Sequence, residues 1–139
     1  SSDIDKLKNI KSSNLYCLPF VNPPDHLEIT SWAHIGILTY VPVTGETTSP
    51  LNAIYCAPNK IYEYAMFGIP MIGNDIPGLK TEFDKSGIGQ VFDSFTKKDI
   101  LDAIKRIEVD YNRMSDNTYA FFDSFDNKAA FQKILNELK

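Results

Sequence analysis

The sequence predicts one α/β domain in which a parallel β-sheet is covered by helices on both faces. Two observations support this prediction. Short, nearly continuous apolar runs alternate along the chain with segments of helical periodicity, which is the order expected of strand–helix–strand units. The runs are apolar throughout, as in strands that are buried on both sides of a parallel sheet. The chain has 139 residues, of which 43% are hydrophobic. This is enough for residues 1–139 to form a single domain with one packed core.

Four apolar runs are expected to form the strands, and the segments around them the helices. The expected strands cover residues 14–21, 34–40, 69–74 and 88–92. The expected helices cover residues 3–11, 26–33, 59–67, 79–85, 97–111, 112–125 and 127–138, so that residues 112–139 form a helical C-terminus. The stretch 42–58 is rich in proline and small polar residues and is expected to be a long irregular loop.

Charge and cysteine content exclude several classes of function. A net charge of -4 and a pI near 5.1 argue against nucleic acid or an anionic membrane as the main partner. The longest nearly apolar run, residues 35–43, is too short to span a bilayer, and no signal peptide is visible. Cys17 and Cys56 fit no metal-ligand spacing, nor do His26 and His34, and Cys17 is expected to be a buried free thiol. These features favour a reducing cytoplasm and no metal site.

The segment that follows the long loop carries the chemistry. A parallel sheet binds ligands beyond the carboxyl ends of its strands, and the helix expected from Asn59 begins there. Its first turn has unpaired N–H groups, and Lys60 adds a positive charge that suits a phosphate. Glu63, about one turn further, can accept hydrogen bonds from two neighbouring sugar hydroxyls. This combination indicates a nucleoside diphosphate site. The alternative interpretation is an ordinary amphipathic helix in which Glu63 balances the dipole and Lys60 is solvated.

A series of motifs in a fixed order resembles a known family. The series comprises W-A-H-I-G-I-L at 32–38, P-N-K-I-Y-E-Y at 58–64, G-I-P-M-I at 68–72, D-I-P-G at 75–78, G-I-G-Q-V-F-D at 87–93 and the helix at 98–107. Over residues 14–125 the chain resembles the nucleotide-sugar-binding half of retaining GT-B glycosyltransferases of the group 1, or family 4, kind. The resemblance implies a Rossmann-like domain that binds a nucleoside diphosphate sugar as donor substrate and needs no metal.

The resemblance also implies roles for individual residues. Pro58, Asn59 and Lys60 begin the helix at the diphosphate, and Glu63 matches the glutamate that binds the donor ribose. The strand end formed by Phe20, Val21 and Asn22 would face the nucleobase, and Tyr40 would line the donor cleft. The family often has the pattern E-x7-E, and Glu63 matches its second glutamate. Tyr55 stands where the first glutamate would contact the donor sugar, so this position lies at the sugar without its usual carboxylate.

The function expected from this resemblance is donor binding in a retaining transferase. The parent enzyme would transfer a hexose-type sugar to a glycan or lipid-linked acceptor, in bacterial surface polysaccharide synthesis, in the cytoplasm or at the inner face of the membrane. Because the chain is shorter than a two-domain enzyme, we expect a fragment that lacks its first strands and its acceptor-binding domain. Such a fragment is expected to be inactive alone and to self-associate through an open sheet edge.

Two alternatives stay open. One is a non-catalytic, flavodoxin-like binding or signalling module, although the acidic cluster that receiver domains need after the first strand is reduced here to Asp25. The other is an epimerase-type enzyme, which the absence of a Gly-x-x-Gly-x-x-Gly motif after the first strand disfavours.

Overall fold

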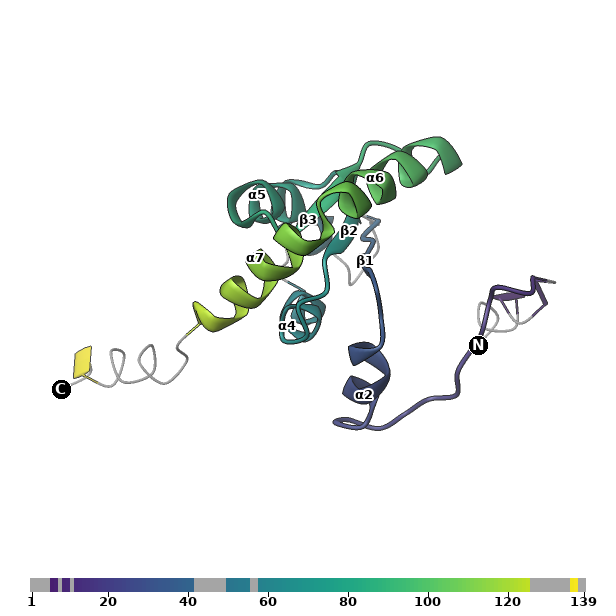
Figure 1. Ribbon diagram of the computed structural model, residues 1–139, viewed down its shortest axis with the longest axis horizontal. Helices are drawn as coiled ribbons and strands as arrows, with labels where there is room; N and C mark the ends of the chain where they lie inside the picture. Colours follow the sequence, from purple (N-terminus) through teal and green to yellow (C-terminus); the bar gives the residue numbers. More distant parts are fainter. Residues whose placement is uncertain are drawn as a thin grey trace.

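The computed structural model describes residues 6–7, 9–10, 12–41, 50–55, 58–125 and 136–137, and the statements below concern these residues. They form a three-stranded parallel sheet flanked by helices, as Figure 1 shows. In chain order the elements are α2 (His26–Ser31), β1 (Gly36–Leu38), α3 (Pro50–Tyr55), α4 (Asn59–Ala65), β2 (Met71–Asn74), α5 (Pro77–Ser86), β3 (Gly89–Phe92), α6 (Lys97–Val109) and α7 (Tyr111–Asp123). The predicted α/β class is therefore confirmed, together with a Rossmann-like arrangement.

The sheet is centred on β2. The strand order is β1-β2-β3, and the pairing is parallel, with Gly36 opposite Met71 and Met71 opposite Gly89. All four residues of β2 are buried, whereas the middle residue of β1, Ile37, is 61% exposed. The middle strand thus forms the core of the domain, and β1 lies at its edge.

Helices cover both faces of the sheet, as predicted. On one face, α4, α5 and α7 pack on a core cluster comprising Leu38, Ile61, Ala65, Met71, Ile76, Leu79, Phe83, Ile88 and Phe121. On the other face, α6 and the start of α7 pack on a second cluster comprising Ile72, Phe92, Ala103, Ile107 and Met114. Met71 and Ile72 are adjacent on β2 but belong to different clusters, because successive strand residues point to opposite faces.

Local sequence signals account for where the helices begin and end. The Thr96 side chain accepts a hydrogen bond from the backbone N–H of Asp99 at 3.2 Å and caps the start of α6. Gly87 follows α5 with a φ of +65°, and Gly68 follows α4 with a φ of +64°, a backbone conformation that glycine adopts without strain.

The last described helix returns to the turn after α4. The hydroxyl of Ser115 on α7 donates a hydrogen bond to the carbonyl of Gly68 at 2.7 Å. The ring of Tyr119 lies so close to Gly68 that a Cβ there would fall 2.1 Å from it. The rings of Tyr62 and Phe121 stack with centroids 6.0 Å apart. The helical C-terminus predicted from residue 112 is thus confirmed as far as residue 123, and α7 fixes α4 to the rest of the fold.

The strand predicted at residues 14–21 is wrong. Residues 12–20 form neither helix nor strand and lie outside the sheet, and Tyr16 and Phe20 are 80% and 85% exposed. Cys17, predicted to be buried, is an exposed free cysteine. An apolar run becomes a buried strand only where a neighbouring strand supplies hydrogen bonds and covered faces, and the structure gives this run no such neighbour.

Two element boundaries also differ from the prediction. The expected loop at 42–58 contains a helix, α3, because Pro50 is tolerated in the first turn and the next five residues allow helix formation. Helix α5 begins at Pro77, two residues earlier than expected, because a proline is tolerated in the first turn of a helix. The remaining described strands and helices lie where the sequence predicts them. Most of the helices predicted at 3–11 and 127–138, and Cys56, lie outside the described residues.

Candidate functional site

Helix α4 presents the first three predicted site residues at its start. Pro58 precedes the helix with an extended backbone and is buried, and its carbonyl accepts the N–H of Ile61 at 2.9 Å. Ile61 is buried in the core, whereas Asn59 and Lys60 are exposed. The apolar side of α4 therefore anchors the helix, and its first turn leaves the Lys60 ammonium group open to solvent.

The last turn of α4 contacts the start of β1. The ring of Tyr64, in the last turn, lies against Gly36 at the start of β1, where a Cβ would fall 2.5 Å from the ring. Burial raises the pKa of the Tyr64 phenol, a hydrogen bond with the backbone of Ile37 opposes that shift, and the charge of Glu63 adds to it. The neutral Tyr64 thus fixes the end of α4 to the start of β1.

Glu63 lies beside a residue that the sequence analysis assigned no role. Its carboxylate Oε2 lies 3.7 Å from Nε2 of His26, the first residue of α2, and both side chains are 33% exposed. The other ring nitrogen of His26, Nδ1, is buried and has no hydrogen-bond partner among the described residues. At 3.7 Å, His26 Nε2 and the Glu63 carboxylate are neighbours but lie beyond hydrogen-bond distance, and part of the Glu63 carboxylate stays accessible to solvent.

No sequence signal identified His26 as a neighbour of Glu63. The two residues are 37 positions apart, and only the packing of α2 against α4 brings them together. The turn at 22–25 predicted the start of α2 correctly, but not the helix face that meets α4. Among the described residues, no group of three or more His, Cys, Asp or Glu side chains is placed to hold a metal ion.

The predicted base-facing residues lie at the entrance to α2. The carbonyl of Asn22 accepts the backbone N–H of His26 at 3.3 Å, so the end of this segment is tied to the helix that meets Glu63. Val21 is half-buried, whereas Phe20 is exposed. The structure therefore brings Asn22 toward the Glu63 side of the molecule and leaves the Phe20 ring in solvent.

Tyr40 and Tyr55 occupy two different surroundings. The backbone N–H of Tyr40 donates to Asn74 Oδ1, and Asn74 Nδ2 donates to the Tyr40 carbonyl, both at 2.8 Å. The Asn74 amide thereby extends the pairing of β1 and β2, and the half-buried ring of Tyr40 packs against the core. Tyr55 ends α3, which packs on α5, and it is 67% exposed.

The turn before α5 is closed by local interactions. Asp75 donates its N–H to the carbonyl of Phe92 at 3.0 Å, which joins the ends of β2 and β3. Its carboxylate accepts from the ammonium of Lys80 at 3.2 Å. Lys80 is thus paired within the protein, whereas no ion pair engages Lys60 among the described residues.

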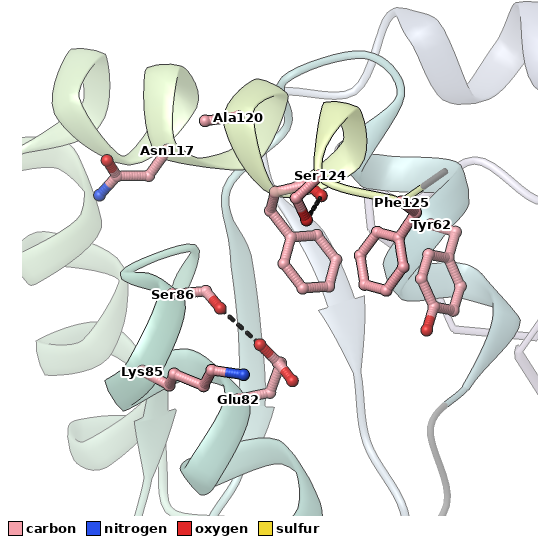
Figure 2. Close-up of a pocket in the computed structure, with 9 residues that line it drawn as sticks. Tyr62, Glu82, Lys85, Ser86, Asn117, Ala120, Ser124 and Phe125 are labelled. Atoms are coloured by element: carbon pink, nitrogen blue, oxygen red, sulfur yellow. Dashed lines mark hydrogen bonds between the residues drawn. The ribbon is translucent and has the colours of Figure 1, made fainter. Parts of the chain in front are cut away.

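A cavity of about 510 Å³ lies away from the predicted site, between α5, α7 and α4. Figure 2 shows Glu82, Lys85 and Ser86 on one side of it and the rings of Tyr62 and Phe125 on another. Ser86 donates to Glu82, Asn117 donates to the Gly87 carbonyl, and Ser124 donates to the Phe121 carbonyl. The Ser86, Asn117 and Ser124 side chains of this cavity are thus engaged by Glu82 or by carbonyls at the helix ends.

Comparison of the chain with protein-family models, curated proteins and solved structures finds no match. None of the helices in the described part of the chain has the length and hydrophobicity that crossing a bilayer requires. The fold and the site therefore define a Rossmann-like α/β unit with a lysine and a glutamate on one accessible side of α4. What this unit binds is inferred from its geometry and its motifs.

Proposed function

We propose that the chain is the donor-binding unit of a retaining glycosyltransferase and binds a nucleoside diphosphate sugar beside α4. The observation that carries the proposal is the joint placement of Lys60 and Glu63. They are three residues apart on one helix, and such residues are neighbours on a helix surface. Lys60 is exposed and has no ion-pair partner among the described residues, and Glu63 lies beside His26 and is partly exposed. The motif order around α4, which resembles the family 4 donor half, supports the same assignment.

The two side chains divide the recognition of a nucleoside diphosphate. Lys60 and the first-turn N–H groups attract the diphosphate, and the ammonium group stabilises the charge of the departing diphosphate during transfer. The Glu63 carboxylate accepts hydrogen bonds from the two ribose hydroxyls. In the parent reaction the sugar passes with retention to a glycan or lipid-linked acceptor, for surface polysaccharide synthesis in the cytoplasm. The acceptor would be bound by a further domain, so this chain alone is expected to bind without transferring.

The second candidate is a non-catalytic, flavodoxin-like binding module. It is favoured by Tyr55, which stands where the family usually has a glutamate that contacts the donor sugar. Such a module would hold a phosphorylated ligand at the same end of the sheet with no requirement for a ribose diol. The dependence of affinity on the ribose hydroxyls therefore separates the two candidates.

Calorimetric titration of the chain with UDP, GDP and ADP, their 2′-deoxy analogues and pyrophosphate tests the proposal. We expect at least one ribonucleoside diphosphate to bind, and its deoxy analogue to bind about tenfold more weakly, because a charge-assisted hydrogen bond contributes about 1.5–3 kcal/mol. Glu63→Gln should reduce the diol preference and leave pyrophosphate binding unchanged. Lys60→Ala should weaken both ligands, and the loss should shrink in high salt.

Two controls make the outcome decisive. Lys80→Ala removes a lysine that is already paired with Asp75 and should leave nucleotide affinity unchanged. His26→Gln keeps a donor near Glu63 and should retain more diol preference than His26→Ala. Absence of binding by every nucleoside diphosphate would overturn the proposal. If Glu63→Gln weakened pyrophosphate as much as nucleotide, Glu63 would be a structural residue of α4.

A further inference from the structure

The outer edge of β1 has no partner strand among the described residues. Gly36 donates its N–H to the Pro70 carbonyl at 2.9 Å, and both backbone groups of Tyr40 bond to Asn74, so these residues face β2. Because the backbone groups of successive strand residues alternate in direction, those of Ile37 and Thr39 point away from the sheet. A hydrogen bond from Tyr64 engages the backbone of Ile37. From there to Thr39 the described edge is open.

Apolar side chains line this open edge. Ile37 and Val41 are 61% and 60% exposed, although Ile72, which is paired with Ile37, is buried beneath α6. Parallel strands are normally covered on both faces, and unpaired edges readily add a further strand. The edge of β1 thus has the composition of a buried strand in a place where the described part of the chain leaves it uncovered.

The same chain carries a segment of complementary character. Between Ser12 and Asn22 there is no charged residue, and Leu15, Tyr16, Leu18 and Phe20 are exposed. The end of this segment is tied to α2 by the contact of Asn22 with His26, and Figure 1 shows the preceding residues running away from the sheet. A strand-forming segment and a strand-accepting edge are therefore both present and are not paired with each other.

We propose that two copies of the chain form a closed dimer by exchanging these segments. Residues 15–20 of one copy add a strand to the β1 edge of the other, and the second copy returns the same contact. Residues 35–41 are uncharged like the segment, so the exchange buries no charge. The aromatic rings of Tyr16 and Phe20 from both copies, at about 150–250 Å² each, bury about 600–1,000 Å², before the side chains that they cover on the edge are counted. Specific and stable interfaces begin at about 1,200 Å².

Pro19 fixes the register in which the segment can join the β1 edge. Because proline has no N–H, the residues that turn their backbone groups toward β1 must be Tyr16, Leu18 and Phe20. Pro19 then lies on the new outer edge, where it cannot donate to a further strand. When two copies exchange their segments reciprocally, each gives one and receives one, and the assembly closes with twofold symmetry. This inference does not depend on the ligand of the α4 site.

Sedimentation at increasing concentrations of the 139-residue chain tests the dimer. We expect a reversible monomer–dimer equilibrium without larger species. Leu18→Asp in the segment and Ile37→Lys on the edge should each weaken dimerisation at least tenfold. Both positions are exposed, so circular dichroism should show an unchanged fold. Val109→Asp makes a similar change on the exposed end of α6 and should dimerise like the unmodified chain.

Mixing the two defective variants distinguishes strand exchange from other association. A Leu18→Asp copy keeps an intact edge, and an Ile37→Lys copy keeps an intact segment, so one exchange survives in the mixed pair. The other contact brings the introduced aspartate of one copy to the introduced lysine of the other, and these two charges attract. The mixture should therefore dimerise at concentrations at which each variant alone stays monomeric. A strictly monomeric unmodified chain, open polymers, or a mixture that stays monomeric would each overturn the proposal.

Discussion

Strands β1 and β2 are both apolar, but the structure treats them differently. β2 lies between two partners and is buried on both faces, whereas β1 has one partner among the described residues and exposes Ile37. The same imbalance extends along the chain: of the 17 large hydrophobic side chains described as exposed, 12 precede residue 56. The difference shows that an apolar run specifies the ability to form a buried strand, while its neighbours decide whether burial occurs.

The largest expected effect comes from truncating one isoleucine on each strand. Ile72 and Ile37 are partners in the β1–β2 register, but they are 3% and 61% exposed. Ile72→Ala should lower the free energy of unfolding by about 2–5 kcal/mol, and Ile37→Ala by about 0.5 kcal/mol or less. Urea denaturation at a concentration that keeps the chain monomeric measures both. Equal losses would mean that β1 is as fully packed as β2.

A smaller effect is expected where the two strands are joined by a side chain. Asn74→Ala removes both hydrogen bonds to the backbone of Tyr40 and should cost about 2 kcal/mol, at about 1 kcal/mol for each bond. The amide of Tyr40 should then exchange its hydrogen faster while the amides of β3 stay protected. Unchanged exchange at Tyr40 would contradict the role assigned to Asn74.

The third effect concerns the hydrogen bond between Tyr64 and the backbone of Ile37. Tyr64→Phe loses the hydrogen bond with Ile37 and should cost about 1 kcal/mol at neutral pH. Burial raises the pKa of Tyr64 above its ordinary value of 10.0 in the folded state. Its contribution to stability is therefore complete below pH 10 and is lost as the pH rises through the folded-state pKa. The difference between the stabilities of the two proteins should shrink above about pH 10, and a difference that grows there would be contrary evidence.

The smallest effect is expected where the entry to β1 meets α6 and α7. His34 Nε2 lies 3.0 Å from Glu108 Oε1, its ring stacks on Tyr111 at 4.2 Å, and the Tyr111 hydroxyl donates to the His34 carbonyl at 3.0 Å. Because His34 and Glu108 are largely exposed, His34→Ala should cost about 1 kcal/mol or less in urea denaturation. Glu108→Gln retains a hydrogen-bond acceptor and should cost less. A loss comparable to that of Ile72→Ala would show that this contact holds β1 more firmly than its sheet pairing does.

Periodicity and turn residues were sufficient to predict the central part of the fold. The strands at β2 and β3 and the helices α4, α6 and α7 follow directly from apolar spacing, and the end of α4 follows from Gly68. The run at 14–21 has the same composition but no partner in the described structure, and composition cannot show whether a partner is present.

The surroundings of the candidate site were predictable only in part. The order of Pro58, Asn59, Lys60 and Glu63 on one helix follows from the sequence. The contact of Glu63 with His26 does not, because it depends on how α2 and α4 pack. The bridge between Tyr40 and Asn74 was also missed, since an asparagine that pairs with a backbone leaves no periodic signal.

The return of α7 to the turn after α4 has a consequence for synthesis on the ribosome. Ser115 and Tyr119 hold the Gly68 turn, and Phe121 packs against Tyr62. These residues are translated some 50 positions after the turn that they hold. Because domains are made from the N-terminus onward, α4 leaves the ribosome well before its anchor exists. The helix that carries Lys60 and Glu63 is therefore expected to reach its final position only when α7 has emerged.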